Sequence, residues 1–150
     1  MKITKELLRE KGACAAGYRD FLKEFPEEKY PDGVEYQDLL DCCAEKNFSY
    51  GSWLLSEFGR TDDVRRVDGD LITKKSIIFA GRLEVSGIIK AGEGIKAGEG
   101  IKAGCGIEAG WEFGIYAGLR VRITSECRKI IAKTKPENIM CGEFVEAENE

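Results

Sequence analysis

The feature that most constrains this chain is a short repeat in its second half. Residues 89–106 read Ile-Lys-Ala-Gly-Glu-Gly twice and then Ile-Lys-Ala-Gly-Cys-Gly. Each unit begins with a large aliphatic residue and has a small or apolar residue two places later, and the same spacing of six continues on both sides. The first places are Leu71, Ile77, Leu83, Ile89, Ile95, Ile101, Ile107, Ile115 and Val121, with one longer unit before Ile115.

These units predict short β-strands wound into a solenoid. Residues two apart share a face of an extended chain, so Ile95 and Ala97 are expected to point inward and Lys96 toward water. The other outward positions are Lys90, Lys102 and Glu108. We expect the glycine after each small residue to turn a corner, because glycine reaches positive φ at little steric cost. A flexible Gly-rich linker is the alternative, but linkers have no reason to place Ile or Leu at every sixth residue.

Short helices are expected before the repeat. Candidate helix caps are Thr4, Asp32 paired with Glu35 in a capping box, and Ser49. One helical face carries Cys14, Tyr18, Phe21, Leu22 and Phe25. Such short helices are not stable alone, so they must pack on one another or cover an end of the solenoid.

The expected fold class is therefore α+β: an N-terminal cap of short helices followed by a Gly-rich β-solenoid of about nine rungs. We expect the cap at 1–60, a polar connector at 61–70, the solenoid at 71–126, and a C-terminal strand with an acidic tail at 127–150. A further strand is expected at 139–144, where the rung pattern returns.

Composition narrows the chemistry. The chain has a formal net charge of −4, six cysteines without a Cys-x-x-Cys pair, and no histidine, which is the commonest general base and metal ligand. No signal peptide and no membrane span are expected, so we expect a cytoplasmic protein with free thiols. We expect no catalytic residue, no metal and no cofactor. Gly-Glu-Gly-Ile-Lys-Ala at 92–97 matches the residue pattern of a dinucleotide-binding motif. No helical sequence follows it, however, so we do not expect nucleotide binding.

The chain resembles a group of small phage and prophage proteins. The resemblance lies in the segment Lys11-Gly12-Ala13-Cys14, in Phe21 and Phe25 after it, and in the Ile-Lys-Ala-Gly-x-Gly repeats. It implies a product of a mobile element, for which binding and inhibiting a host defence protein is an expected role, as anti-CRISPR proteins do. The repeat is also similar to those of hexapeptide-repeat acyltransferases and bactofilins. However, the acyltransferases place the small inward residue before the aliphatic one and use a histidine base.

The best candidate binding residues interrupt the repeat. Large apolar side chains fall where regular rungs place Lys, Glu or Gly, and they are Trp111, Phe113, Tyr116 and Leu119. Such side chains need a cover, which is another part of this chain, a second copy in a homodimer, or a partner protein.

A second candidate surface is acidic. Residues 20–45 hold nine acidic and two basic residues, and Asp32, Glu35 and Asp38 are its candidate contacts. This surface is either an ordinary solvated helix face or a mimic of a phosphate backbone. Nucleic-acid binding by the basic residues at 128–135 is not expected, because no aromatic residues lie among them. We therefore expect a non-enzymatic protein that occludes a surface of a host protein; the alternative is a scaffold that self-assembles by stacking solenoid ends, as bactofilins do.

Overall fold

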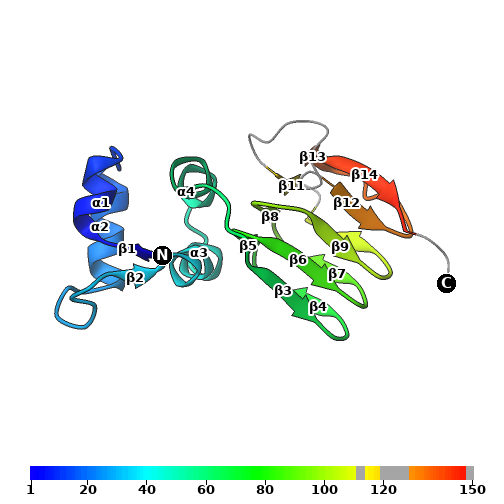
Figure 1. Cartoon of the computed structure of the whole chain (residues 1–150), viewed down its shortest axis with the longest axis horizontal. Coiled ribbons are helices and arrows are strands. Elements are labelled where there is room, and N and C mark those ends of the chain that lie inside the picture. The colour runs from blue at the N-terminus through cyan, green and yellow to red at the C-terminus, as the bar shows by residue number, and fades with distance from the viewer. Residues whose placement is uncertain (111–113, 119–128, 148–150) are drawn as a thin grey trace.

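The computed structural model of the protein describes residues 1–110, 114–118 and 129–147. Within them, helices at the N-terminus are followed by a β-solenoid, so the expected fold class is confirmed (Figure 1). The helices are α1 (Lys5–Glu10), α2 (Ala15–Glu24), α3 (Tyr36–Glu45) and α4 (Gly51–Phe58). The strands β1 (Lys2–Ile3) and β2 (Val34–Glu35) pair antiparallel and tie the N-terminus to the start of α3.

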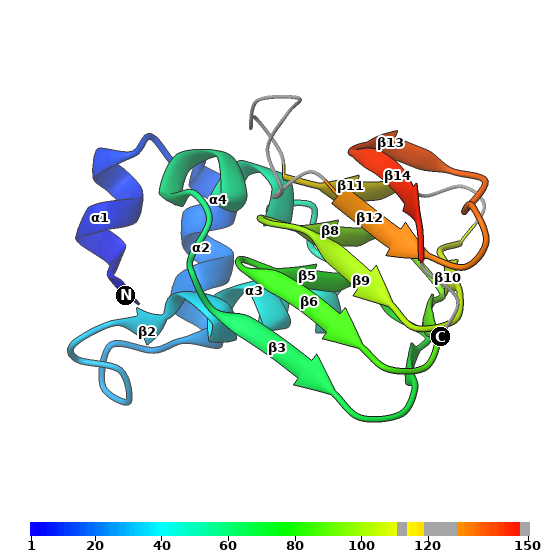
Figure 2. The same ribbon diagram turned by 45° about the vertical axis from the view of Figure 1, so that its right-hand side comes forward.

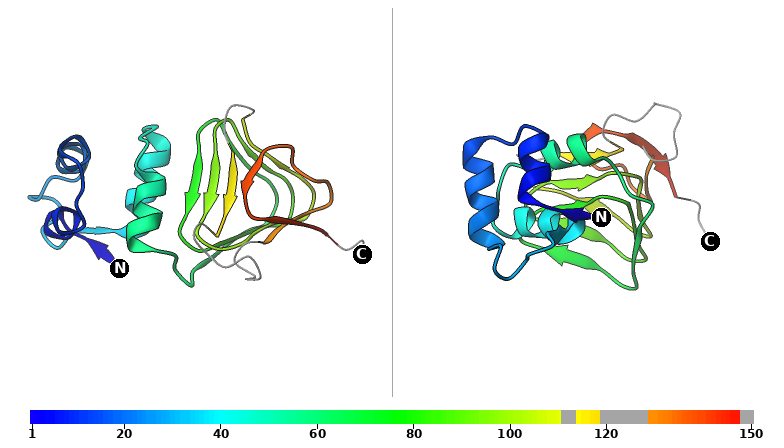
Figure 3. Two further views of the ribbon diagram at one scale, coloured as in Figure 1. Left: turned by 90° about the horizontal axis from the view of Figure 1, so that it is seen from above. Right: turned by 60° about the vertical axis from the view of Figure 1, so that its left-hand side comes forward.

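The solenoid has three parallel sheets, which form a triangle when seen from above (Figure 3). The five-stranded sheet contains β3 (Val64–Val67), β6 (Arg82–Val85), β9 (Ile101–Ala103), β12 (Lys129–Ala132) and β14 (Glu143–Glu146). The three-stranded sheet contains β4 (Leu71–Thr73), β7 (Ile89–Ala91) and β10 (Ile107–Glu108). The four-stranded sheet contains β5 (Ile77–Phe79), β8 (Ile95–Ala97), β11 (Ile115–Ala117) and β13 (Ile139–Cys141), one from each of four successive coils.

Equivalent repeat positions stack directly on one another. Ile95 lies between Ile77 and Ile115 in the ladder, and Ala97 lies between Phe79 and Ala117. All of them are buried, and all except Phe79, which lies beneath Arg65, belong to one continuous core in which Ile95 has no exposed surface. The predicted inward positions are thus confirmed through Ala117, whereas Val121 lies outside the described residues.

One corner glycine, Gly118, has the expected positive φ, at 62°, but three others are required for a different reason. The φ angles of Gly92, Gly98 and Gly104 are not positive. Each instead donates its N–H to a carbonyl of the coil beneath it, as Gly104 does to Val85 at 2.9 Å. A Cβ at Gly104 would overlap the carbonyl oxygen of Ser86, and the other two positions have the same kind of obstruction. Close approach of backbones between coils, rather than positive φ, therefore selects glycine here.

The solenoid extends beyond 71–126 at both ends. The strand β3 lies inside the segment expected to be a connector and pairs with β6. The basic segment after residue 128 forms β12, which pairs with β9, and the returning rung pattern forms β13 and β14. An arginine at an inward position concealed this strand, because Arg65 occupies the place that Leu83 fills in the next coil.

The helices lie beside the four-stranded sheet, with α3 next to β5 (Figure 2). Gln37 of α3 occupies the free side of β5, where it donates to the Ile78 carbonyl at 2.8 Å and accepts from the Ala80 N–H at 3.0 Å. Arg65 points across the start of the solenoid core toward the Phe79 ring and pairs with Asp41 of α3. Helix α3 thus replaces a missing neighbouring strand at this edge.

The helix ends match some of the predicted caps. Thr4 Oγ1 accepts from the Leu7 N–H at 3.1 Å, as expected. The capping box was wrong, because Asp32 lies in a turn before β2 while Glu35 is itself the N-cap and makes no side-chain cap bond. Tyr50, not Ser49, is the N-cap of α4.

Candidate functional site

Tyr116 is the one aromatic residue of the predicted patch that the structure describes. It is the middle residue of β11 and faces outward from the four-stranded sheet. The ladder aligns it with Lys96 of β8, and Lys96 aligns with Ile78 of β5. Met140 is the middle residue of β13, the next strand of the same sheet. Trp111, Phe113 and Leu119 lie outside the described residues.

A groove runs between this outward row and the loop that joins α3 to α4. Its volume is about 400 Å³. We call it the Tyr116 groove, and it is lined by Asn47, Phe48, Ser49, Ser76, Ile78, Gly94, Lys96, Gly114, Tyr116, Asn138 and Met140. Both the helical region and four successive coils of the solenoid contribute to it, because α3 is fixed to β5 by Gln37.

Polar and apolar side chains share the lining of the groove, and its apolar part includes Met140 and Tyr116. Met140 is 67% exposed, which is high for a side chain of this size, and Tyr116 is half-buried. Gly114 is required there, because a Cβ at this position would overlap Met140 and approach the Tyr116 ring to 2.9 Å. A flexible thioether beside an aromatic ring is well suited to contact an apolar protein surface.

Lys96 differs from the other outward lysines. Lys90 and Lys102 are exposed as expected, whereas Lys96 is half-buried, so the expectation that it faces water was wrong. Its Nζ lies 5.7 Å from the centroid of the Tyr116 ring, within the range of a cation–π interaction. Burial lowers its pKa, since the charged form is less well solvated in the groove. A partner that covered this lysine would need to supply an acceptor for it.

The acidic candidates lie elsewhere. Asp32, Glu35 and Asp38 are exposed, and none of them lines the Tyr116 groove. Glu35 contacts Lys2 at 3.4 Å and the N-terminal ammonium at 3.5 Å. The hydrogen bond from Lys2, followed by the N-terminal charge, lowers its pKa.

Other carboxylates of the same stretch also have partners. Glu27 pairs with Lys5, Asp41 with Arg65, and Asp20 accepts a hydrogen bond from Tyr50. With Glu35, these make four of the nine acidic residues of 20–45. Because a phosphate mimic needs unpaired charges at regular spacing, this pairing favours the ordinary helix face over the mimic.

Two of the cysteines lie on α3. Cys43 is buried, and burial raises its pKa to about 12. Burial and the nearby Glu24 also raise the pKa of Cys42. Cys14 is exposed at the N-cap of α2, where Sγ accepts from the Gly17 N–H. Within the part of the chain that the structure describes, no group of three or more Cys, Asp or Glu side chains could hold a metal ion.

Comparison with known proteins finds a related family for the helical region only. Residues 1–62 match the YdhT N-terminal domain, a match that ends after α4 and before β3. It covers less than half of the chain and does not include the solenoid. No curated protein and no solved structure matches this chain. Among the described residues, no helix is long and apolar enough to pass through a bilayer.

Three residues of the groove were missed from the sequence. Phe48, Lys96 and Met140 joined Tyr116 only when the fold was known. The return of the rung pattern at 139–144 was a usable signal for Met140, because it places the middle residue of a strand outward. No sequence signal placed Phe48 beside the solenoid.

Proposed function

We propose that this chain is a non-enzymatic protein-binding module that occludes a surface of a host protein through the Tyr116 groove. One observation supports this proposal most directly: an exposed and a half-buried apolar side chain point outward from strands where a regular rung carries a charged residue. Met140 and Tyr116 form this part of the groove, next to Phe48 of the helical region.

The solenoid makes this surface rigid. Ile95 and Ile115, beneath Lys96 and Tyr116, are fully buried, and parallel ladders hold their strands on both sides. A surface that is ordered before binding loses little conformational entropy when a partner docks. The arrangement therefore suits recognition of a folded protein surface without rearrangement.

A phage origin and an anti-defence role, as in anti-CRISPR proteins, are the finer part of the proposal. They are supported by the resemblance to phage and prophage proteins in Lys11-Gly12-Ala13-Cys14 and in the repeats. The match to the YdhT N-terminal domain covers the first of these features. The cytoplasm of the host cell is where such a protein would act.

Self-assembly by stacking of solenoid ends is the second candidate. It is less well supported, because Gln37 already occupies the free side of β5 and Arg65 lies across the first coil. A homodimer that covers the groove is a third possibility. Both are distinguished from host-protein binding by light scattering at increasing protein concentration, where a constant monomeric mass argues against them.

The direct test is affinity capture from bacterial lysate with the full chain. We expect a host protein to be retained by the wild type and lost by the double variant Tyr116→Ala, Met140→Ala. The matched control is Ile72→Ala, which removes an outward side chain, 60% exposed, from the middle of β4 on another sheet. Equal retention by the groove variant and the control would contradict the proposal, provided that both variants show the wild-type circular dichroism spectrum.

A further inference from the structure

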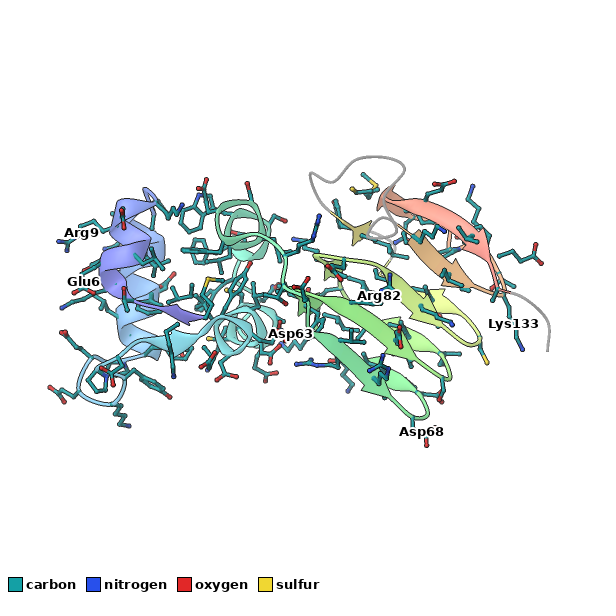
Figure 4. The ribbon with its side chains drawn as sticks, viewed as in Figure 1. Glu6, Arg9, Asp63, Asp68, Arg82 and Lys133 are labelled. Atoms are coloured by element: carbon teal, nitrogen blue, oxygen red, sulfur yellow. The ribbon has the colours of Figure 1, made fainter. Side chains whose placement is uncertain are left out.

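The helical region contains a cavity that the groove does not explain. It has a volume of about 290 Å³ and lies between the α1–α2 hairpin and the α3–α4 hairpin. We call it the helical cavity, and the aromatic residues that line it are Phe21, Phe25, Phe48, Tyr50 and Trp53. Side chains of the two hairpins point toward one another across this space (Figure 4). All residues that line the cavity fall within residues 1–62.

The cavity is open and apolar rather than a closed packing defect. Phe25, Phe48 and Trp53 are only partly buried although they line it. Tyr50 forms a strut across the gap, since its hydroxyl donates to Asp20 of α2 at 2.8 Å. This bond links α2 to the start of α4 beside the cavity.

The charged side chains that line the cavity have one sign. They are Asp20 and Glu24, which lie one helical turn apart on α2, and no basic side chain lines it. Glu24 lies close enough to α3 to influence Cys42 on the opposite wall. An apolar group that enters here is therefore favoured when a positive charge accompanies it.

The volume of the cavity indicates the size of the group that it can hold. An apolar cavity of about 150 Å³ holds benzene, and typical small-ligand pockets begin near 300 Å³. A volume of about 290 Å³ therefore suits one large side chain, such as that of Trp, rather than a cofactor.

The cavity also adjoins the Tyr116 groove. Phe48 lines both, so one side of the α3–α4 loop faces the cavity while the other faces the groove. A segment that inserts a side chain into the cavity can continue over Phe48 onto Tyr116.

From this geometry we propose that the helical cavity receives a large apolar side chain, flanked by basic residues, from the protein that binds the Tyr116 groove. The proposal rests on the proposed function for its biological partner. The cavity's preference for a basic, aromatic peptide is a property of this chain alone and is tested separately.

The experiment uses three short peptides as probes of the full chain: acetyl-Lys-Trp-Lys-amide, acetyl-Glu-Trp-Glu-amide and acetyl-Lys-Ala-Lys-amide. Backbone amide NMR shifts follow binding at low salt. We expect the Lys-Trp-Lys peptide to bind with a Kd of roughly 1 mM and to shift amides of α2, α3 and α4. We expect the Glu-Trp-Glu peptide to bind at least about fivefold more weakly, since two solvent-exposed charge interactions are reversed. The Ala peptide is expected not to bind.

Variants connect the binding to the cavity. Asp20→Asn with Glu24→Gln removes both charges while an amide oxygen still accepts from Tyr50, and it should abolish the preference for Lys-Trp-Lys over Glu-Trp-Glu. Glu28→Gln, with an exposed carboxyl that does not line the cavity, is the charge control. Cys42→Phe should fill the cavity and remove binding, whereas the same exchange at exposed Cys105 should not.

Thiol alkylation gives an independent readout. The Lys-Trp-Lys peptide should slow the reaction of Cys42 with iodoacetamide and leave that of Cys105 unchanged. Equal binding of the two Trp peptides, shifts confined to the solenoid, or binding of free 3-methylindole without any peptide binding would each overturn the proposal. Loss of host-protein capture in Tyr116→Ala, Met140→Ala tests the function instead, because these residues do not line the cavity.

Discussion

The solenoid and the helical region bury their apolar residues in two different ways. In the solenoid, small and branched aliphatic side chains repeat from coil to coil, and backbone ladders keep each column in register. The helical region packs unlike aromatic and aliphatic side chains between two hairpins and retains a cavity of about 290 Å³. The comparison shows that repetition permits close packing with small residues, whereas short helices need large side chains to reach one another and leave space between them.

The largest expected difference between the regions is their response to a truncated core residue. Ile101→Ala in the solenoid should lower the free energy of unfolding by about 4 kcal/mol, because ladders on both sides of β9 prevent collapse. Leu40→Ala in α3, equally buried, should cost about 3 kcal/mol, because the helices can shift to fill the space. Chemical denaturation of each variant measures both values. A larger loss for Leu40→Ala would reverse the comparison.

The second largest effect is expected at the corner glycines, which test whether close backbone spacing between coils stabilises the solenoid. Gly104→Ala should destabilise the protein by about 2–3 kcal/mol, because the new Cβ forces two coils apart. Gly106 is the control two residues away, where a Cβ would meet only Thr134 Oγ1, at 3.9 Å. Gly106→Ala should therefore be neutral or stabilise by about 0.5 kcal/mol, through the reduced entropy of the unfolded chain. Thermal unfolding of the two variants side by side is sufficient; similar losses would show that backbone spacing is not what selects glycine.

The contact between the two regions gives a smaller effect. Gln37→Glu keeps the acceptor for Ala80 N–H but loses the donor to the Ile78 carbonyl and to Asp41 Oδ1, and should cost about 1–2 kcal/mol at pH 7. Protonation of the new carboxyl restores a donor, so the loss should shrink as the pH falls below about 4. Denaturation at several pH values measures this, with Asp38→Asn on the exposed side of α3 as control. A loss that does not change with pH would exclude the hydrogen bond as its cause.

The smallest expected effect lies at the N-terminal ribbon of the helical region. Lys2 hydrogen-bonds to Glu35 and lowers its pKa. Lys2→Met should therefore raise the pKa of Glu35, while Lys11→Met should leave it unchanged. Because the pKa of Glu35 is depressed in the folded state, its contribution to stability is present above the pKa of the unfolded chain and is lost as the pH falls through the folded value. An NMR titration of the Glu35 carboxyl carbon distinguishes the two variants.

Much of the solenoid was predictable because its determinants are local and repeated. Each unit has an inward residue at the two places that Ile95 and Ala97 occupy in theirs, so the structure of one unit predicts that of the next. The strand β3 escaped prediction, since Arg65 stands where later coils carry Leu83 and Ile101.

The candidate site was predictable only in part, since it depends on contacts between distant segments. Tyr116 was found as an exception to the repeat. Phe48 and Met140 reach it only because Gln37 fixes the helical region against β5, and a pattern of six residues contains no information on that contact. The helical cavity was missed for the same reason, as it lies between two hairpins whose side chains are distant in the sequence.

Because Gln37 pairs with the free edge of β5, the solenoid can change its length during evolution without exposing that edge. With the helices fixed to the first coil, duplication of one eighteen-residue coil in the middle of the chain would leave both ends intact and move them apart by about 4.8 Å. The distance between the helices and the C-terminal strands can therefore increase by one coil at a time, while the sequence at both ends stays the same.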